Sequence, residues 1–387
     1  MLTASGPLHR IARLMLGFRA PAAIAALIAA AALAACSPGD YDDEAPEDAT
    51  LTVYVSAPLR GESAEEGRAI VNGAKLALAD AGGEVGGVDV EAIYMDDTAG
   101  EGRKAGWDPV VVADNARRAA QDSTAIAYFG DLESGATRIS LPITNQAMML
   151  QVSAASTAVD LTQESSASDT VPELAQPTGE RTFGRVIPDD EKQAGAGAVW
   201  TKKLGFKSAV VLRDRSEFAE VVADEFAEEA EALGIVVERP VGELKYLATE
   251  ELPEFKAGVE EGTSMATEAA FDSDRVGLIT SSAQAPEQLP AAGQAFVRAY
   301  EREFGDPPDR YAAYGYEAMA VVLDSIERAE DPRDRSAVID AFFATTDRDS
   351  VLGTYSIDEV GDTTLDAIAG YRVEDGEPRF DSALRAP

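Results

Sequence analysis

Two loops rich in small and hydroxyl-bearing residues carry the clearest chemistry in this sequence. The first, residues 130–137, reads Gly-Asp-Leu-Glu-Ser-Gly-Ala-Thr and follows a predicted strand. The second, residues 153–157, reads Ser-Ala-Ala-Ser-Thr and follows the next predicted strand. Ser134 would stand at a helix start, where a hydroxyl and unpaired backbone N–H groups suit a carboxylate. A turn or a helix cap is the commoner use of such residues, so both interpretations are open at this point.

The sequence leaves few kinds of catalysis available. His9 is the only histidine and Cys36 the only cysteine, and both lie in or next to a predicted export signal. Without a histidine base, serine or cysteine nucleophile systems and histidine-ligated zinc sites are excluded. Hydrolysis by two facing carboxylates, as in a glycosidase, stays an alternative. We expect a protein that is not an enzyme and has no cofactor or metal, with Asp96-Asp97 forming a strand-end turn.

The first 35 residues read as a secretory signal. The stretch up to Arg19 is basic, and an apolar run over 20–35 follows it. That run is shorter than the roughly 20 residues that span a membrane comfortably. It ends in Leu33-Ala34-Ala35-Cys36, which resembles a bacterial lipobox and implies lipid attachment at Cys36. The acidic, proline-containing segment 36–50 is typical of a flexible tether.

The order of predicted elements indicates an α/β protein with two lobes. From residue 51 the sequence alternates short apolar runs with amphipathic segments, beginning with a strand over 51–55 and a helix over 64–81. Asp108 followed by Pro109 is typical of a helix start. Such alternation predicts a parallel sheet with helices on both faces. It pauses over 163–182 and resumes, so two doubly wound parallel-sheet lobes fit the length best.

Several stretches together resemble the leucine/isoleucine/valine-type periplasmic binding proteins, the amino-acid receptors of ABC importers. The resemblance covers most of residues 51–380 and rests on the order and spacing of its parts. Those parts are Pro58-Leu59-Arg60-Gly61, residues 72–77, Asp96-Asp97, residues 134–137, residues 153–162, residues 183–190 and residues 311–318.

The resemblance implies a type I periplasmic-binding fold, in which three crossovers join two lobes that close on a ligand. We place the crossovers near Pro188, Ala285 and Leu352. The N-terminal lobe would then comprise 51–187 plus 285–351, and the C-terminal lobe 188–284 plus 352–381.

The resemblance also implies how a ligand is held. In the family, a serine equivalent to Ser134 and a threonine equivalent to Thr157 hold the carboxylate of an amino acid. A carbonyl equivalent to that of Ala155 takes the ammonium, and an aromatic residue equivalent to Phe218 covers the ligand. We expect the ligand-binding residues to be Ser134, Ala155, Ser156, Thr157, Phe218, Glu66, Glu133 and Tyr314.

The sequence departs from the family at three places. Glu66 stands where many relatives have an aromatic residue. Phe218 replaces a commoner tyrosine, and its position in the predicted helix also suits a side chain of the hydrophobic core. Residues 238–276 are short for the two strand–helix units of relatives, since one βαβ unit needs roughly 30 residues. We predict one helix over 250–261 and no apolar strand there, so the second lobe would be shortened and the family's acidic ammonium partner missing.

The expected function is an exported, lipid-anchored receptor that delivers a small polar solute to an ABC permease. A branched-chain or other amino acid is the first choice, and an amide or urea-like solute the second. The alternatives are a ligand sensor of the same fold and a scaffold lipoprotein that binds no solute. The net charge of -36 repels nucleic acid, so we expect no such partner, and we expect a monomer.

Overall fold

The computed structural model describes residues 45–46, 49–102, 105–164, 172–212, 217–238, 265–271, 274–374 and 377–387. The predicted signal over 1–35, the lipidation site Cys36 and nearly all of the predicted tether lie outside these residues. So does the helix predicted over 250–261. Within the described part of the chain, every helix falls short, in length or apolar content, of what a membrane crossing needs.

The first lobe is built on a six-stranded sheet in the order β2-β3-β1-β6-β7-β8. Neighbouring strands from β3 through β8 pair in parallel, and only the short β2 pairs antiparallel, with β3. The predicted parallel sheet is therefore confirmed in this lobe. Its strands are β1 (Leu51–Ala57), β2 (Glu84–Val85), β3 (Val88–Asp96), β6 (Ala125–Phe129), β7 (Leu150–Ser153) and β8 (Phe183–Arg185).

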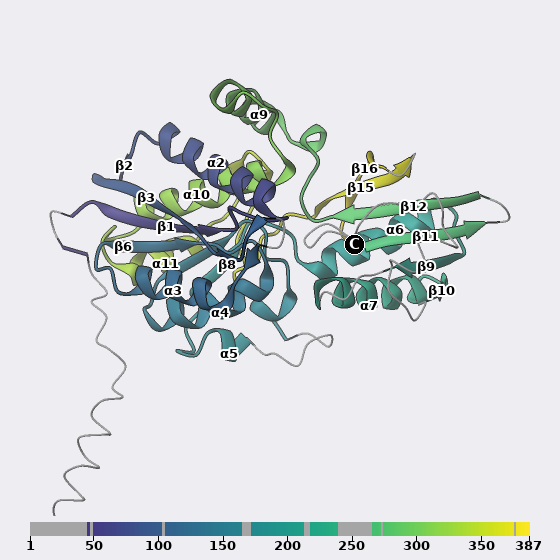
Figure 1. Cartoon of the computed structure of the whole chain (residues 1–387), viewed down its shortest axis with the longest axis horizontal. Helices are drawn as coiled ribbons and strands as arrows, with labels where there is room; N and C mark the ends of the chain where they lie inside the picture. The colour runs from purple at the N-terminus through teal and green to yellow at the C-terminus, as the bar shows by residue number, and fades with distance from the viewer. Residues whose placement is uncertain are drawn as a thin grey trace, which may run out of the picture. The chain divides into compact units, whose positions relative to one another are not determined.

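Helices cover both faces of this sheet (Figure 1), with α2 and α10 packed together on one face and α3 and α4 on the other. Asp108 caps α3 by accepting from the N–H groups of Val110 and Val111, and Pro109 is its first residue. The helical elements of this lobe are α2 (Ala64–Asp80), α3 (Pro109–Ala120), α4 (Ser134–Gln146), η3 (Val159–Leu161), α5 (Pro172–Ala175), η4 (Pro286–Gln288), α9 (Ala291–Phe304), α10 (Arg310–Arg328) and α11 (Arg335–Phe343). Two small antiparallel pairs complete it, β4 (Thr98–Ala99) with β5 (Gly106–Trp107) and β13 (Arg348–Ser350) with β14 (Gly353–Tyr355).

Two glycines allow α2 and α10 to approach closely. A Cβ on Gly73 would lie 2.1 Å from the Ala312 carbonyl oxygen, and one on Gly315 would lie 2.3 Å from that of Ile70. Neither position has room for a side chain, because real Cβ atoms do not come this close to backbone oxygens. The glycines in the stretches 72–77 and 311–318 therefore serve helix packing.

The second lobe is built on a six-stranded sheet in the order β10-β9-β11-β12-β15-β16. Only β9 and β10 pair in parallel, and the remaining neighbours are antiparallel. Two of those pairs, β11–β12 and β15–β16, are joined by two residues each, a connection that only antiparallel strands can use. The prediction of a parallel sheet is thus corrected here. The strands are β9 (Ser208–Leu212), β10 (Val236–Glu238), β11 (Met265–Phe271), β12 (Asp274–Ser281), β15 (Ala367–Glu374) and β16 (Glu377–Arg385).

Helices α6 (Asp190–Lys203) and α7 (Glu217–Ala232) pack on each other and on this sheet. Strand β11 lies in the stretch where we predicted no strand, so that expectation was wrong. Its sequence, Met-Ala-Thr-Glu-Ala-Ala-Phe, has few β-branched residues, and its pairing with β9 and β12 on both sides supplies what local propensity lacks.

Three segments connect the lobes: residues 186–189, 282–290 and 356–366. Side chains tie the second of these segments to α6 and to the turn between β13 and β14. Gln193 of α6 accepts from the backbone N–H of Ser282 at 3.0 Å, and Gln284 donates to the Leu352 carbonyl at 3.0 Å. The lobe boundaries given above remain a proposal.

Candidate functional site

The two hydroxyl-rich loops lie side by side at the carboxyl edge of the first sheet. Residues 130–133 connect β6 to α4, and residues 154–158 follow β7, which pairs in parallel with β6. The Ser134 hydroxyl accepts a hydrogen bond from the Ala158 N–H at 3.1 Å. This is the edge at which open α/β sheets bind ligands.

Polar groups of these loops are left unused by the fold. Among the described residues, the backbone N–H groups of Ser134 and Thr157 donate to no acceptor, and the Ala155 carbonyl accepts from no donor. Ala155 and Thr157 are buried and Ser134 is half-buried. Two N–H groups, one of them at a helix N-terminus, suit a carboxylate, and a lone carbonyl suits an ammonium group.

Ser156 has its partners inside the protein. Its hydroxyl lies 2.6 Å from that of Thr137 and donates to the Asp131 carbonyl at 3.0 Å, and the residue is fully buried. Ser156 therefore joins the second loop to the first. Its predicted contact with a ligand stays a prediction.

Buried carboxyl groups lie beside the first loop. Burial raises the pKa of Asp131 to about 6, although hydrogen bonds such as that from Ser140 at 2.5 Å oppose the rise. Burial also raises the pKa of Asp97 to about 9, and the charges of Asp131 and Glu133 add to it. Neither carboxylate oxygen of Asp97 has a hydrogen-bond partner in the described structure. Glu133, a predicted ligand contact, is buried and precedes α4.

The remaining predicted contacts lie on other elements. Glu66, in the first turn of α2, pairs with Arg310 at 3.0 Å. Tyr314 is fully buried in α10, where its hydroxyl accepts from the Gln284 N–H at 3.0 Å and donates to the Ser282 carbonyl at 3.2 Å. Tyr314 thus supports a segment that connects the lobes. The side chain of Phe218 lies outside the described part of the structure.

Asp190 is a polar residue next to the site that the sequence analysis did not select. It is the first residue of α6, and its N–H donates to the Thr157 carbonyl at 3.0 Å. Burial raises the pKa of the Asp190 carboxyl to about 7, and the nearby Thr157 side chain and the Arg185 charge oppose the rise. The sequence signal was the pair Asp189-Asp190 at a helix start, which we interpreted only as part of a crossover.

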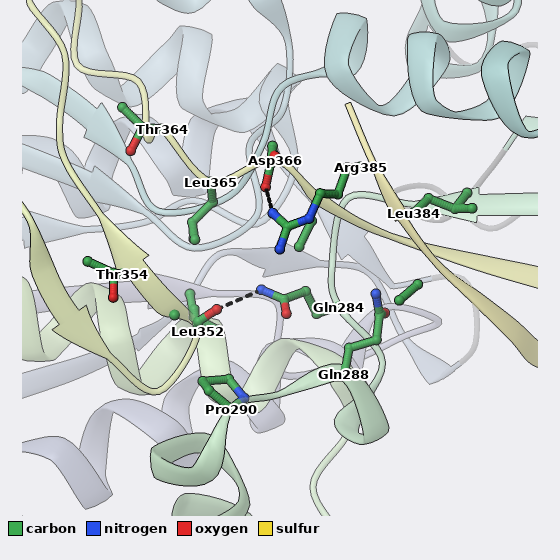
Figure 2. Close-up of a pocket in the computed structure, with 13 residues that line it drawn as sticks. Gln284, Gln288, Pro290, Leu352, Thr354, Thr364, Leu365, Asp366, Leu384 and Arg385 are labelled. Atoms are coloured by element: carbon green, nitrogen blue, oxygen red, sulfur yellow. Dashed lines mark hydrogen bonds and ion pairs between the residues drawn. The ribbon is translucent and has the colours of Figure 1, made fainter. Parts of the chain in front are cut away.

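A separate pocket of about 280 Å³ lies among the segments that connect the lobes (Figure 2). Gln284 reaches the Leu352 carbonyl there, and Arg385 forms an ion pair with Asp366. None of the residues predicted to bind ligand lines it. As for metals, the described residues contain no group of three or more His, Cys, Asp or Glu side chains placed to hold an ion.

The sequence profile of the periplasmic binding protein family matches residues 50–249 and 256–377. This chain belongs to that family. Its members are non-enzymatic receptors for solutes outside the cytoplasm, so the prediction that the chain is not an enzyme is confirmed. The resemblance stated from the sequence is confirmed as well. No functionally curated protein matches the chain.

Solved structures show the same fold. The chain is similar to the leucine binding protein LivK from Thermotoga maritima, with 22% identity and a TM-score of 0.67 over 87% of this chain and 99% of that one. It is also similar to LivJ from Streptococcus pneumoniae in complex with isoleucine, with 18% identity and a TM-score of 0.66 over 88% and 100%. A solute binding protein from Rhodopseudomonas palustris in complex with benzoate gives 16% identity and a TM-score of 0.66 over 88% and 97%. At these identities the likeness shows the type I periplasmic-binding fold alone.

Proposed function

We propose that this protein captures a small amino acid outside the cytoplasm and delivers it to an ABC permease in the membrane. The two lobes would close on the solute, so that the closed form binds it best. A branched-chain amino acid is the first choice, because two of the similar structures are named for leucine binding or contain isoleucine.

The observation that carries this proposal is the set of unused backbone groups at the two loops. The N–H groups of Ser134 and Thr157 would take the carboxylate, with the Ser134 hydroxyl, and the Ala155 carbonyl would take the ammonium. Charge-assisted hydrogen bonds of this kind are short and strong. A few of them, with burial of the solute, account for micromolar affinity, which corresponds to about -8 kcal/mol.

Lipid attachment at Cys36 is the second part of the proposal. It rests on the basic N-terminal stretch, the apolar run and the Leu-Ala-Ala-Cys sequence. Each buried CH2 of an acyl chain contributes about 0.8 kcal/mol, so two or three chains hold a protein on a membrane. The acidic segment 36–50 would then give the binding lobes reach from the membrane surface.

Calorimetry on the purified full-length chain in detergent tests the ligand. The panel is leucine, isoleucine, valine, benzoate, acetamide and urea, against wild type and the double variant Ser134→Ala with Thr157→Ala. We expect micromolar binding of at least one branched-chain amino acid and its loss in the double variant. The matched control is Thr346→Ala, because Thr346 is an exposed threonine far along the chain from both loops.

Silence of the folded wild type toward every amino acid would refute the amino-acid assignment. Binding that the double variant leaves unchanged would refute the role of the two hydroxyls, because the backbone groups remain in the variant, and it would leave the solute class in place.

A further inference from the structure

The indole ring of Trp107 lies against the start of α4, beside the first of the two hydroxyl-rich loops. A Cβ on Gly135, the second residue of α4, would lie 2.9 Å from Cζ2 of Trp107 and 3.3 Å from its Cη2. A side chain at this position would therefore collide with the ring. Gly135 directly follows Ser134, whose N–H and hydroxyl are proposed to hold the solute's carboxylate. The ring thus approaches the backbone within one residue of that donor.

The orientation of the ring brings its polar atom to the same place. The third atom near the Gly135 position is Cε2 of Trp107, at 3.8 Å, and in an indole this carbon is bonded to Nε1. The edge of the ring that faces α4 is therefore the edge next to the indole N–H. Trp107 is half-buried, and its N–H donates to no acceptor among the described residues. Tryptophan N–H groups usually find a partner when they are buried.

The backbone around Trp107 is held in place by its neighbours. Trp107 pairs with Thr98 in the β4–β5 hairpin, and Arg60 donates to the Thr98 carbonyl at 2.5 Å. The next residue, Asp108, donates its N–H to the Asp97 carbonyl at 3.0 Å and caps α3. A donor on such a fixed segment loses little conformational freedom when a solute binds.

We propose that Trp107 is a further solute-binding residue. Its indole N–H donates to the carboxylate of the solute, next to the N–H of Ser134, and its ring then borders the solute on the side of α3. The residue comes from the β4–β5 hairpin, an element that carries none of the ligand contacts expected from the sequence.

The inference rests on the proposed function and bears on its class of solute. A hydrogen bond to a charged acceptor is roughly twice as strong as one between neutral groups. An added N–H donor therefore favours a solute with a carboxylate over acetamide or urea, which offer only a neutral carbonyl oxygen. It separates the first choice of solute, an amino acid, from the second, an amide or urea-like compound.

Fluorescence tests the contact directly, because Trp107 and Trp200 are the two tryptophans of the chain. Trp200 is buried in α6 and 3% exposed. In the full-length chain, Trp200→Phe leaves Trp107 as the reporter, and Trp107→Phe leaves Trp200. We expect leucine to change the emission of Trp200→Phe with the midpoint that calorimetry gives, and to leave the emission of Trp107→Phe unchanged. If Trp200→Phe fails to fold, wild type replaces it, and Trp107→Phe should lack the wild-type signal.

Calorimetry on the same variants measures the contribution of the N–H group. Trp107→Phe keeps an aromatic ring and removes the donor, so it should weaken leucine about ten- to a hundredfold, as expected for the loss of a hydrogen bond to a charged group. Trp200→Phe is the matched control and should bind leucine within about twofold of wild type. If Trp107→Phe fails to fold, the emission of Trp107 in Trp200→Phe still decides whether the ring meets the solute.

Unchanged emission of Trp107 at saturating leucine would overturn the inference, and so would unchanged leucine affinity in Trp107→Phe. An emission change of equal size in both variants would report movement of the lobes and would overturn it too. In each of these cases leucine binding to wild type would keep the proposed function. Failure of the folded wild type to bind any carboxylate solute would instead refute the proposed function, and the inference with it.

Discussion

The guanidinium of Arg185 meets the carboxylate of Asp362 at 2.7 Å, and both side chains are buried. Arg185 ends the last strand of the first sheet, whereas Asp362 lies in the segment that returns to the second sheet. Arg185 also donates to the Ala158 carbonyl at 2.7 Å and to the Thr162 hydroxyl at 2.9 Å. This pair therefore links the end of β8 and the connecting segment 356–366 to the loop that carries Thr157.

Removing one partner of this pair should destabilise the protein strongly. Burial alone would raise the pKa of Asp362, but the Arg185 charge and the hydrogen bonds from Arg185 and Gln163 together outweigh it and hold that pKa below its usual range. Asp362→Asn leaves Arg185 buried without its counter-charge, which costs about 3–5 kcal/mol in the free energy of unfolding. Urea unfolding of wild type and Asp362→Asn at pH 7 measures this difference in the free energy of unfolding.

The stability that the charged Asp362 gives to the wild type should be lost as the pH falls. A carboxyl with a lowered folded-state pKa stabilises above its unfolded pKa, and the contribution disappears as the pH drops through the folded value. Asp114→Asn, which removes an exposed ion pair with Arg117, is the control and should change stability by less than about 1 kcal/mol. An equal cost for the two variants would contradict the role of Asp362.

Asp97 should have the opposite effect on stability. Its folded-state pKa of about 9 exceeds the ordinary value of 3.8, so the unfolded chain releases this proton at lower pH than the folded one. From about pH 4 to about pH 9 the carboxyl therefore destabilises the fold by up to about 1.4 kcal/mol per pH unit. Asp97→Asn should be more stable than wild type at pH 8 and nearly equal to it at pH 4.

The adjacent Asp96 provides the control. Hydrogen bonds from Thr98 and Arg60 outweigh the effect of burial and lower the pKa of Asp96. Asp96→Asn should therefore reduce stability at pH 8, where Asp97→Asn raises it. Urea unfolding at several pH values decides the matter, and a stability difference for Asp97→Asn that does not change with pH would refute the prediction.

The sequence allowed the first lobe to be predicted more fully than the second. Its strands are apolar, its helix starts carry recognisable caps such as Asp108, and both signals are local. Strand β11 carries no such signal, because its Met-Ala-Thr-Glu-Ala-Ala-Phe sequence becomes a strand through pairing with β9 and β12. The antiparallel order of the second sheet likewise depends on two-residue connections.

The candidate site was predictable only where its residues carry a local sequence signal. Ser134 and Thr157 stand out because hydroxyl residues follow two successive strands. Tyr314 was selected from a motif, and only the fold shows that its hydroxyl is used by Ser282 and Gln284. Asp190 could not be chosen, since its relation to Thr157 depends on where the chain crosses between lobes.

Close packing of α2 against α10 predicts that both contact glycines are required. Gly315→Ala would place its Cβ 2.3 Å from the Ile70 carbonyl oxygen and force the helices apart. Overpacking of this kind costs about 1–3 kcal/mol or more. Gly106→Ala is the control, because nothing lies within 4 Å of its Cβ position. Thermal unfolding of both variants checks this, and equal melting temperatures would show that the helices have room to separate.

Lipid attachment predicts a defined N-terminus for the exported protein. If Cys36 is acylated and the preceding 35 residues are removed, the N-terminal peptide should begin at Cys36 and carry the mass of two or three acyl chains. Cys36→Ser should lack that mass and incorporate no labelled palmitate, because it has no thiol to form the thioether. The described lobes do not include Cys36, so the variant should unfold at the same urea concentration as wild type and bind solute equally. Wild-type protein that retains peptides from residues 1–35 and no acyl group would contradict the anchor while leaving the solute-binding lobes as they are.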